Sequence, residues 1–320
     1  MKKKFIILLL ITLIVIFVCS FFGVKNFTPR ELFEEETRNL WLSMRLPRIV
    51  LGFIAGSCLA LSGMSFQSLF RNPLAEPFTL GISAGATLGC VVCVTLGITG
   101  RILGFTALPL FAFAGALVSV FFVYYLTNIK KNFSTGDMLL AGIGVNFFFS
   151  ALILMLQYFG REYNLAKIMH WTMGGVDIIG YEKIIEILPF VLIGLFFLFK
   201  STRELNLLSV GEDIAVSRGV NVGAVKKIIF FSSSLMVGAV CAVCGPIAFV
   251  GMICPHIMRL IFGYDNRRLV FACFMFGGTF LVVCDTLTRT VIAPTELPVG
   301  IITSLLGGPF FIYLLFKKNK

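Results

Sequence analysis

The chain has 320 residues, of which 58% are hydrophobic and only 13% are charged, and its mean hydropathy is +0.96. A soluble domain does not need that much apolar surface, so this composition excludes an ordinary water-soluble protein and indicates a chain that lies in a lipid bilayer. The formal net charge of +11 would suggest nucleic-acid binding in a soluble protein. In a membrane protein, the distribution of this charge instead helps to assign which loops lie on the cytoplasmic side of the membrane.

Apolar runs long enough to cross a membrane occur about ten times. A helix needs about 20 residues to cross about 30 Å of hydrocarbon. Charged residues, prolines or glycines mark the ends of the apolar runs. The predicted spans are 5–22, 47–70, 80–98, 103–126, 138–159, 184–199, 224–243, 247–262, 269–287 and 299–316. The sequence therefore predicts an all-α, multi-pass membrane protein built as one transmembrane domain over residues 1–320.

The first span follows three consecutive lysines, which raises the alternative of a cleaved signal peptide. Its 18 apolar residues exceed the usual length of a signal core, about 7 to 15 residues, and no A-x-A-like cleavage site follows. We therefore expect a retained helix with the N-terminus in the cytoplasm. Alternating sides from there places 17 of the 27 cations and 6 of the 16 acids inside, so the net charge of +11 lies in the cytoplasm, as does the C-terminus.

Small residues in the spans indicate packing rather than chemistry. The nine cysteines lie in apolar runs, and the Cys90–Cys93 and Cys241–Cys244 pairs have no histidine nearby, so packing is favoured over metal binding. Glycines spaced four apart suggest close helix contacts, with lining of a pathway as a compatible alternative. These glycines are Gly52, Gly56, Gly81, Gly85 and Gly89.

Ionisable residues are scarce inside the spans, where they usually mark function. Asp285 and Arg289 stand four residues apart and can pair on one helix face. His170 and His256 lack a neighbouring nucleophile, so structural roles are the default, with contact between His170 and a metal or haem cargo as the alternative. The chain has no G-x-x-x-x-G-K-[ST] pattern, so ATP and Mg would be bound by a partner and no cofactor by this chain.

The cytoplasmic segment 205–222 is longer than a simple connection. Ser209 and Glu212 have the spacing of a capping box at the start of a short helix. Arg218 lies in the last turn of that helix, and Gly219 suits the left-handed conformation that often ends one, which we call a left-handed stop. A helix of about two turns is too short to be stable alone, so a partner-binding helix is favoured over a solvated loop.

Several short motifs follow one another along nearly the whole chain. They are Arg45-Leu-Pro-Arg48, Gly63-Met-Ser-Phe-Gln67, Arg71-Asn-Pro-Leu-Ala-Glu-Pro77, Trp171-Thr-Met-Gly-Gly175, Leu208-Ser-Val-Gly-Glu212, Gly245-Pro-Ile-Ala-Phe-Val-Gly251, Pro255-His-Ile-Met-Arg259, Glu296-Leu-Pro-Val-Gly300 and Gly307-Gly-Pro-Phe310. In this order they resemble the FecCD-type permease family, which imports ferric siderophores, haem and cobalamin. One departure is Asn266, where a histidine often follows the aspartate.

The resemblance implies the type II ABC importer architecture, with ten helices in each of two permease subunits, here as a homodimer. Two cytoplasmic ATP-binding subunits and a periplasmic or lipid-anchored binding protein would be the other partners, with no nucleic acid. The family's coupling helices match Ser209, Gly211, Glu212, Asp213, Ala215, Arg218 and Gly219, and its cytoplasmic gate matches Ser134 and Thr135. The translocation path is expected at Gly142, Gly144 and Asn146.

The resemblance also implies that Arg45, Arg48 and Arg289 dock carboxylates of the binding protein. This role competes with pairing of Arg289 to Asp285, and snorkelling at the interface is a further alternative. Docking is favoured because arginine binds carboxylates in a planar, bidentate way, and a twofold dimer repeats all three residues.

The expected function is that of a non-enzymatic permease subunit in the bacterial cytoplasmic membrane that imports an iron chelate, a ferric siderophore or haem. Cobalamin is the alternative within the family. An ion-coupled carrier would need more charge inside the membrane, and a membrane-embedded enzyme would need a polar constellation facing a cavity.

Overall fold

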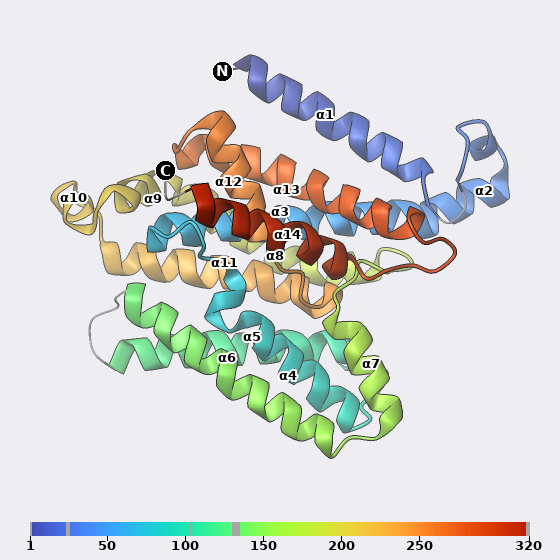
Figure 1. Ribbon diagram of the computed structural model, residues 1–320, viewed down its shortest axis with the longest axis horizontal. Helices are drawn as coiled ribbons and strands as arrows, with labels where there is room; N and C mark the ends of the chain where they lie inside the picture. Colours follow the sequence, from blue (N-terminus) through green and yellow to red (C-terminus); the bar gives the residue numbers. More distant parts are fainter. Residues whose placement is uncertain (1, 24–25, 103, 130–134, 318–320) are drawn as a thin grey trace.

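The computed structural model describes residues 2–23, 26–102, 104–129 and 135–317, and most of them are helical (Figure 1). The long and intermediate helices are α1 (Lys2–Phe21), α3 (Leu46–Phe70), α4 (Ile82–Thr95), α5 (Ala107–Ile129), α6 (Thr135–Tyr158), α7 (Glu162–Thr172), α8 (Glu182–Lys200), α11 (Val222–Cys244), α12 (Val250–Phe262), α13 (Asn266–Thr290) and α14 (Val299–Lys317). The short ones are η1 (Glu31–Phe33), α2 (Glu35–Leu40), η2 (Trp41–Arg45), η3 (Pro77–Leu80), α9 (Thr202–Val210) and α10 (Glu212–Ser217). Two short strands, β1 (Arg101–Ile102) and β2 (Phe105–Thr106), pair antiparallel with Arg101 opposite Thr106.

Each of the ten predicted spans coincides with a helix, but the helices differ in length. Among the described residues, six helical segments are long and apolar enough to cross a membrane, namely α1, the continuous segment from α2 to α3, α5, α6, α11 and α13. The pair α8 and α9, bent by 56°, is a seventh candidate, whereas α4, α12 and α14 are shorter apolar helices. The all-helical, multi-pass prediction is therefore confirmed, and the number of ten spans is not.

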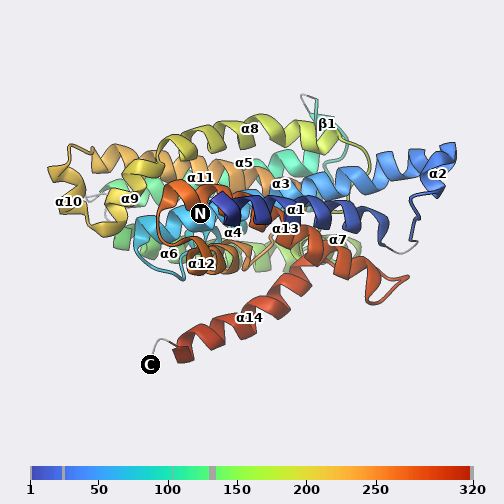
Figure 2. The ribbon, with the colours of Figure 1, turned by 90° about the horizontal axis from the view of Figure 1, so that it is seen from above.

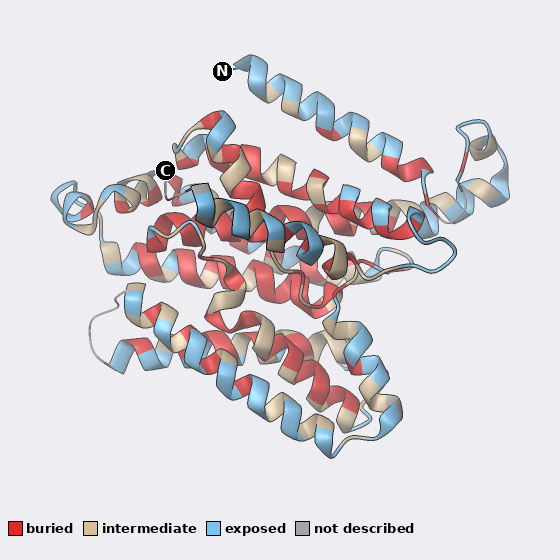
Figure 3. Ribbon diagram, viewed as in Figure 1, coloured by how far each residue is buried: buried red, intermediate tan, exposed pale blue. Residues whose placement is uncertain are grey.

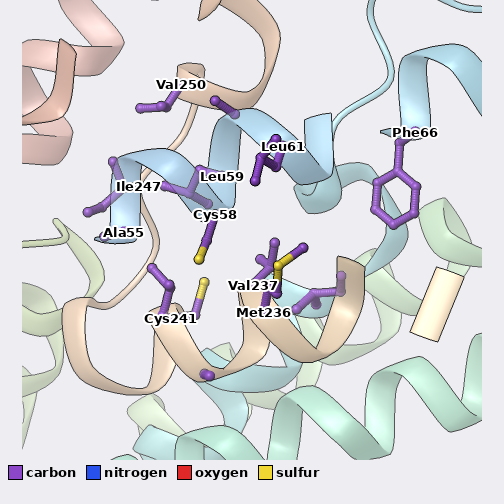
Figure 4. Packing of buried hydrophobic residues seen from close by; sticks show 14 of the residues in the cluster. Ala55, Cys58, Leu59, Leu61, Phe66, Met236, Val237, Cys241, Ile247 and Val250 are labelled. Atoms are coloured by element: carbon purple, nitrogen blue, oxygen red, sulfur yellow. The ribbon is translucent and has the colours of Figure 1, made fainter. Parts of the chain in front are cut away.

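Helix α3 forms the centre of the molecule. It buries 20 of its 25 residues and packs against α11, α12 and α13, whose inner faces are buried as well (Figure 3). Side chains from α3 and α11 interlock in this core, where the thiols of Cys58 and Cys241 face each other (Figure 4). All nine cysteines are buried and free, which confirms that they serve as packing residues.

The glycine spacing explains how closely these helices approach. A Cβ atom at Gly56 would collide with the backbone carbonyl of Gly277 in α13, and one at Gly85 in α4 would collide with the carbonyl of Gly115 in α5. Close packing is thus confirmed at these positions. At Gly52 the nearest atom, Cγ2 of Val282, is 3.6 Å from the Cβ position, an ordinary contact, so the prediction of a close approach is wrong there.

The two ends of the helix bundle differ in what they carry. Figures 1 and 2 show α9 and α10 at one end, and α2 with the connection between α13 and α14 at the other. Helix α14 leaves the bundle and ends apart from it (Figure 2). We call these the α10 end and the α2 end.

Candidate functional site

A network of charged side chains ties four segments together at the α2 end. Arg48, in the first turn of α3, contacts Asp285 of α13 at 2.9 Å, Asp177 before α8 at 2.8 Å and Glu296 before α14 at 2.7 Å between nitrogen and oxygen atoms. Arg289 contacts the other oxygen of Asp285 at 3.1 Å. Two guanidinium groups therefore share one buried carboxylate, and two further carboxylates reach Arg48 from loops.

The three arginines that were predicted to dock a binding protein differ in their partners and exposure. The side chain of Arg289 is only 1% exposed and is held by Asp285, so the intramolecular pair is observed and Arg289 does not lie on the surface. A direct docking contact from Arg289 does not fit this position. The side chain of Arg48 is mostly buried and is paired with carboxylates of this chain, and Arg45 donates to the carbonyl oxygen of Phe22 at 2.8 Å.

Sequence reasoning missed Asp177 and Glu296 as partners of Arg48. Glu296 belongs to a recognised motif, and this membership was the only sequence signal for its role. Asp177 lies two residues past Gly175 in a loop without any charge pattern. Both carboxylates are partly exposed, at 49% and 37%. They remain accessible to water and to a partner.

Backbone segments from three of the recognised motifs contact one another between the centre of the bundle and the α2 end. The amide of Gly175 donates to the carbonyl of Cys244 at 2.8 Å, and the amide of Gly300 donates to the carbonyl of Gly174 at 3.2 Å. A Cβ atom at Gly174, whose φ is +70°, would collide with the carbonyl of Pro246. The glycines are needed here because three backbones meet without side chains between them.

A cavity of about 490 Å³ opens beside this crossing, and its described lining contains no charged residue. Its walls are Thr172, Met173, Pro246, Ala248, Gly300, Ile301, Ser304 and Leu305. Such a wall of small, apolar and weakly polar groups suits a bulky ligand that is not held by fixed charges.

Neither histidine is part of that cavity. His170 is exposed on α7, one turn before Met173, and His256 lies on α12 with its ring 5.6 Å from the ring of Phe310. Within the described residues, no three His, Cys, Asp or Glu side chains come together as a metal site would require.

The residues predicted for the path and the gate lie on α6. Gly142 packs against the backbone of Thr79 and Leu80, and Asn146 donates to the carbonyl of Phe78 at 2.9 Å, so both hold η3 in place. Gly144 is exposed and faces open space. Thr135 is the first residue of α6, and Ser134 lies outside the described residues.

The predicted coupling helix begins later than expected, at Glu212 rather than directly after Ser209, and a separate helix precedes it. Helix α9 ends at Val210 and α10 begins at Glu212, joined by the extended backbone of Gly211. The predicted capping box is wrong, because the hydroxyl of Ser209 donates to the carbonyl of Asn206 within α9. The left-handed stop is confirmed, since φ of Gly219 is +78°.

The side chains of α10 divide into a buried and an exposed set. Ala215 is buried, and Glu212 accepts from the almost fully buried Lys226 of α11 at 2.8 Å. The other predicted coupling residues, Asp213 and Arg218, are exposed, together with Ile214 and Val216. Glu212 thus attaches α10 to the bundle, and the remaining residues leave a free, partly apolar surface.

Comparison with known proteins agrees with this arrangement. The family model described as the FecCD transport family matches residues 9–317. The chain is 35% identical over 313 residues to the hemin transport system permease protein HmuU of Yersinia pestis, covering 93% of this chain and 90% of that protein. It is 36% identical over 316 residues to the vitamin B12 import system permease protein BtuC of Klebsiella pneumoniae, covering 98% and 92%.

A solved structure extends the similarity to three dimensions. The chain superposes with a TM-score of 0.86, at 28% identity and 99% coverage of both chains, on an inward-facing transporter provisionally assigned to the metal-chelate type of ABC transporters. The motifs, the fold and the similarity over nearly the whole length lead to one conclusion. The chain is a membrane permease that belongs to the FecCD transport family.

Proposed function

We propose that this chain is the membrane-spanning subunit of an ATP-driven importer for an iron chelate, either a ferric siderophore or haem. The observation that carries the proposal is the uncharged cavity of about 490 Å³ where three motif segments cross. A large chelate whose metal is already enclosed needs shape and apolar contact rather than metal ligands from the protein. Specificity would then belong mainly to a separate binding protein.

Cobalamin is the second candidate, because a relative 36% identical to this chain is a vitamin B12 permease. Both candidate cargoes are bulky metal chelates, so the same uncharged wall suits either. An importer of this kind would place two permease subunits, as a homodimer, on two cytoplasmic ATP-binding subunits in the bacterial inner membrane, with the chain's termini in the cytoplasm.

In the proposed cycle, the α10 end meets the ATPase and the α2 end meets the binding protein. Closure of the ATPase dimer would move α10, which Glu212 and Lys226 fix to α11, and the helices beside the cavity would change the side that is open. Thr135 and Ser134 would form the cytoplasmic gate, with Gly144 on the path. A carboxylate of the binding protein would compete with Asp177 and Glu296 for Arg48, while Arg45 would add a second contact.

Uptake by proteoliposomes tests the proposal. The permease, reconstituted with its ATPase and binding protein, is expected to take up hemin or a ferric hydroxamate siderophore when ATP is present. Ser304→Trp places a bulky ring in the cavity and should abolish uptake, while the control Leu306→Trp, on the exposed part of α14 outside the cavity lining, should preserve it. Uptake of cyanocobalamin alone would select the second candidate, and uptake driven by an ion gradient without ATP would reject both.

A further inference from the structure

A second, larger cavity lies at the α10 end, and the proposed transport cycle assigns no ligand to it. Its volume is about 760 Å³, and its walls come from the end of α3, the connection 71–74, the end of α9, α12 and α14. Pockets of this size hold small molecules or the head of a lipid. The lining residues differ in kind from those of the first cavity, because they include two arginines.

The charge of this second cavity is positive and uncompensated by its own walls. Arg259, in the last turn of α12, has neutral partners only among the described residues, namely the side-chain carbonyl of Gln67, the backbone carbonyl of Met64 at 3.3 Å and the hydroxyl of Ser68 at 3.5 Å. None of the described lining residues is Asp or Glu. A half-buried guanidinium without a carboxylate favours an anion beside it.

Arg71 provides the second cation from an unusual backbone position. It ends α3 in the left-handed conformation, with a φ of +50°, where glycine or asparagine is the common choice. Its side chain is exposed, so packing does not explain the arginine. An arginine in this strained conformation that also lines the cavity indicates a role in binding.

The acid that follows the cavity in sequence is already engaged elsewhere. Asp265 accepts from Asn206 at 2.7 Å and from the amide and side chain of Arg267. Burial opposes its ionisation, but these hydrogen bonds from Asn206 and Arg267 outweigh that effect and lower the pKa of Asp265. The positive potential of Arg71 and Arg259 is therefore left for a ligand.

The remaining walls combine polar side chains, among them Asn72, Ser209 and His256, with apolar ones that reach the surface between helices. Leu260 on α12 and Val210 on α9 are each 66% exposed, and Leu314 belongs to α14, which stands away from the bundle in Figure 2. Cations and apolar side chains thus meet near the ends of α3, α9, α12 and α14. This combination matches an amphiphile with an anionic head rather than an acidic segment of a protein.

We propose that the second cavity binds the phosphodiester headgroup of an anionic phospholipid, with Arg71 and Arg259 on the phosphate and Leu260 and Leu314 along the acyl chains. The proposed orientation of the chain places this lipid in the cytoplasmic leaflet. Arginine suits the phosphate because its planar donors bind two oxygens at once. The bound lipid bridges the end of α3 to α12 and α14.

Native mass spectrometry of the full-length permease in detergent tests the proposal with three probes: dioleoylphosphatidylglycerol, dioleoylphosphatidylcholine and inorganic phosphate. Wild type should retain phosphatidylglycerol in preference to phosphatidylcholine. Arg71→Asn, which suits the left-handed backbone, should weaken phosphatidylglycerol binding about fivefold. The matched control Arg203→Asn removes an exposed cation of α9 outside the cavity and should leave binding unchanged. Arg71→Gly repeats the test if Arg71→Asn unfolds at lower temperature than wild type.

Three results would overturn the assignment. Equal losses with Arg71→Asn and Arg203→Asn would mean that lipids respond only to overall charge. Equal retention of phosphatidylcholine, or displacement of phosphatidylglycerol by inorganic phosphate, would remove the anionic lipid as the ligand. If Arg71→Asn abolished co-purification with the ATPase while lipid binding stayed intact, the cavity would be a protein contact. None of these measurements depends on transport, so the proposed function stands or falls separately.

Discussion

Asp285 is the residue on which the α2 end depends most. Its carboxylate is 3% exposed and forms ion pairs with both Arg48 and Arg289. Removing one member of a buried ion pair is far more costly than never having the pair, because the remaining charge stays desolvated. The two arginines are therefore parts of the permease's own scaffold, and the proposed docking of Arg48 requires that a partner's carboxylate replace Asp177 or Glu296.

A second buried carboxylate, Glu76, has an electrostatic environment of the opposite kind. It lies in the connection between α3 and η3, and its Oε2 atom has no hydrogen-bond partner among the described residues. Burial raises the pKa of Glu76 to about 7, and a hydrogen bond from the backbone amide of Phe249 offsets only part of this shift. The neutral carboxyl is thus the form that the fold prefers.

This environment predicts a pH dependence of stability. Because the pKa of Glu76 is higher in the folded than in the unfolded state, its contribution is fully present below pH 4.5 and is lost as the pH rises to about 7. The loss amounts to at most about 3 kcal/mol. We expect the thermal unfolding temperature of the wild type in detergent to fall between pH 5 and pH 8, and Glu76→Gln to remove most of that fall.

Glu35→Gln serves as the control for this experiment, because Glu35 is exposed in the first turn of α2. It should unfold with the same pH slope as the wild type. If Glu76→Gln also kept the full slope, the raised pKa of Glu76 would be refuted.

Helix α10 is the element that we propose as the contact with the ATPase. Its six residues form less than two turns, so its shape depends on the turn at Gly219 and on the ion pair between Glu212 and Lys226. Glu212 is therefore a poor choice for testing contact with the ATPase, because its replacement by lysine would set two cations side by side. The exposed residues of α10 isolate the contact from the fold.

We predict that Val216→Glu abolishes co-purification of the permease with its ATPase. Val216 is 61% exposed, so a carboxylate there leaves the fold intact but introduces a desolvated charge into an apolar contact. Val291→Glu, at a similarly exposed residue beyond the end of α13, should co-purify normally. Association of the ATPase with both variants alike would exclude α10 as the contact.

The sequence predicted elements better than it predicted contacts. All ten apolar runs form helices. In lipid, a single segment can satisfy its backbone hydrogen bonds without a partner strand only as a helix. The start of α10 was predicted two residues too early, because the spacing of Ser209 and Glu212 fits a capping box that begins at Ser209, whereas the observed N-cap is Gly211. The partners of Arg48 were missed because Asp177 and Glu296 come from loops more than 100 residues away, where no periodicity applies.

At the scale of the whole molecule, the two ends of the bundle have different charge balances. The α2 end pairs Arg48 and Arg289 with carboxylates, whereas at the α10 end Arg71 and Arg259 have no acidic partner in the described lining of the second cavity. This asymmetry matches the predicted topology, in which the net charge of +11 lies on one face. The positive-inside rule therefore predicts that the α10 end lies in the cytoplasm.

This orientation is open to a direct labelling experiment, because the nine native cysteines are all buried and give a low background. Ser217→Cys places a thiol on exposed α10, and Thr295→Cys places one on the exposed connection before α14. In intact cells that express the permease alone, a membrane-impermeant maleimide should label Thr295→Cys and spare Ser217→Cys. After the membrane is opened with detergent, both should react, which controls for thiol accessibility. Labelling of Ser217→Cys in intact cells would reverse the orientation and, with it, the assignment of α10 to the ATPase and of the basic cavity to the inner leaflet.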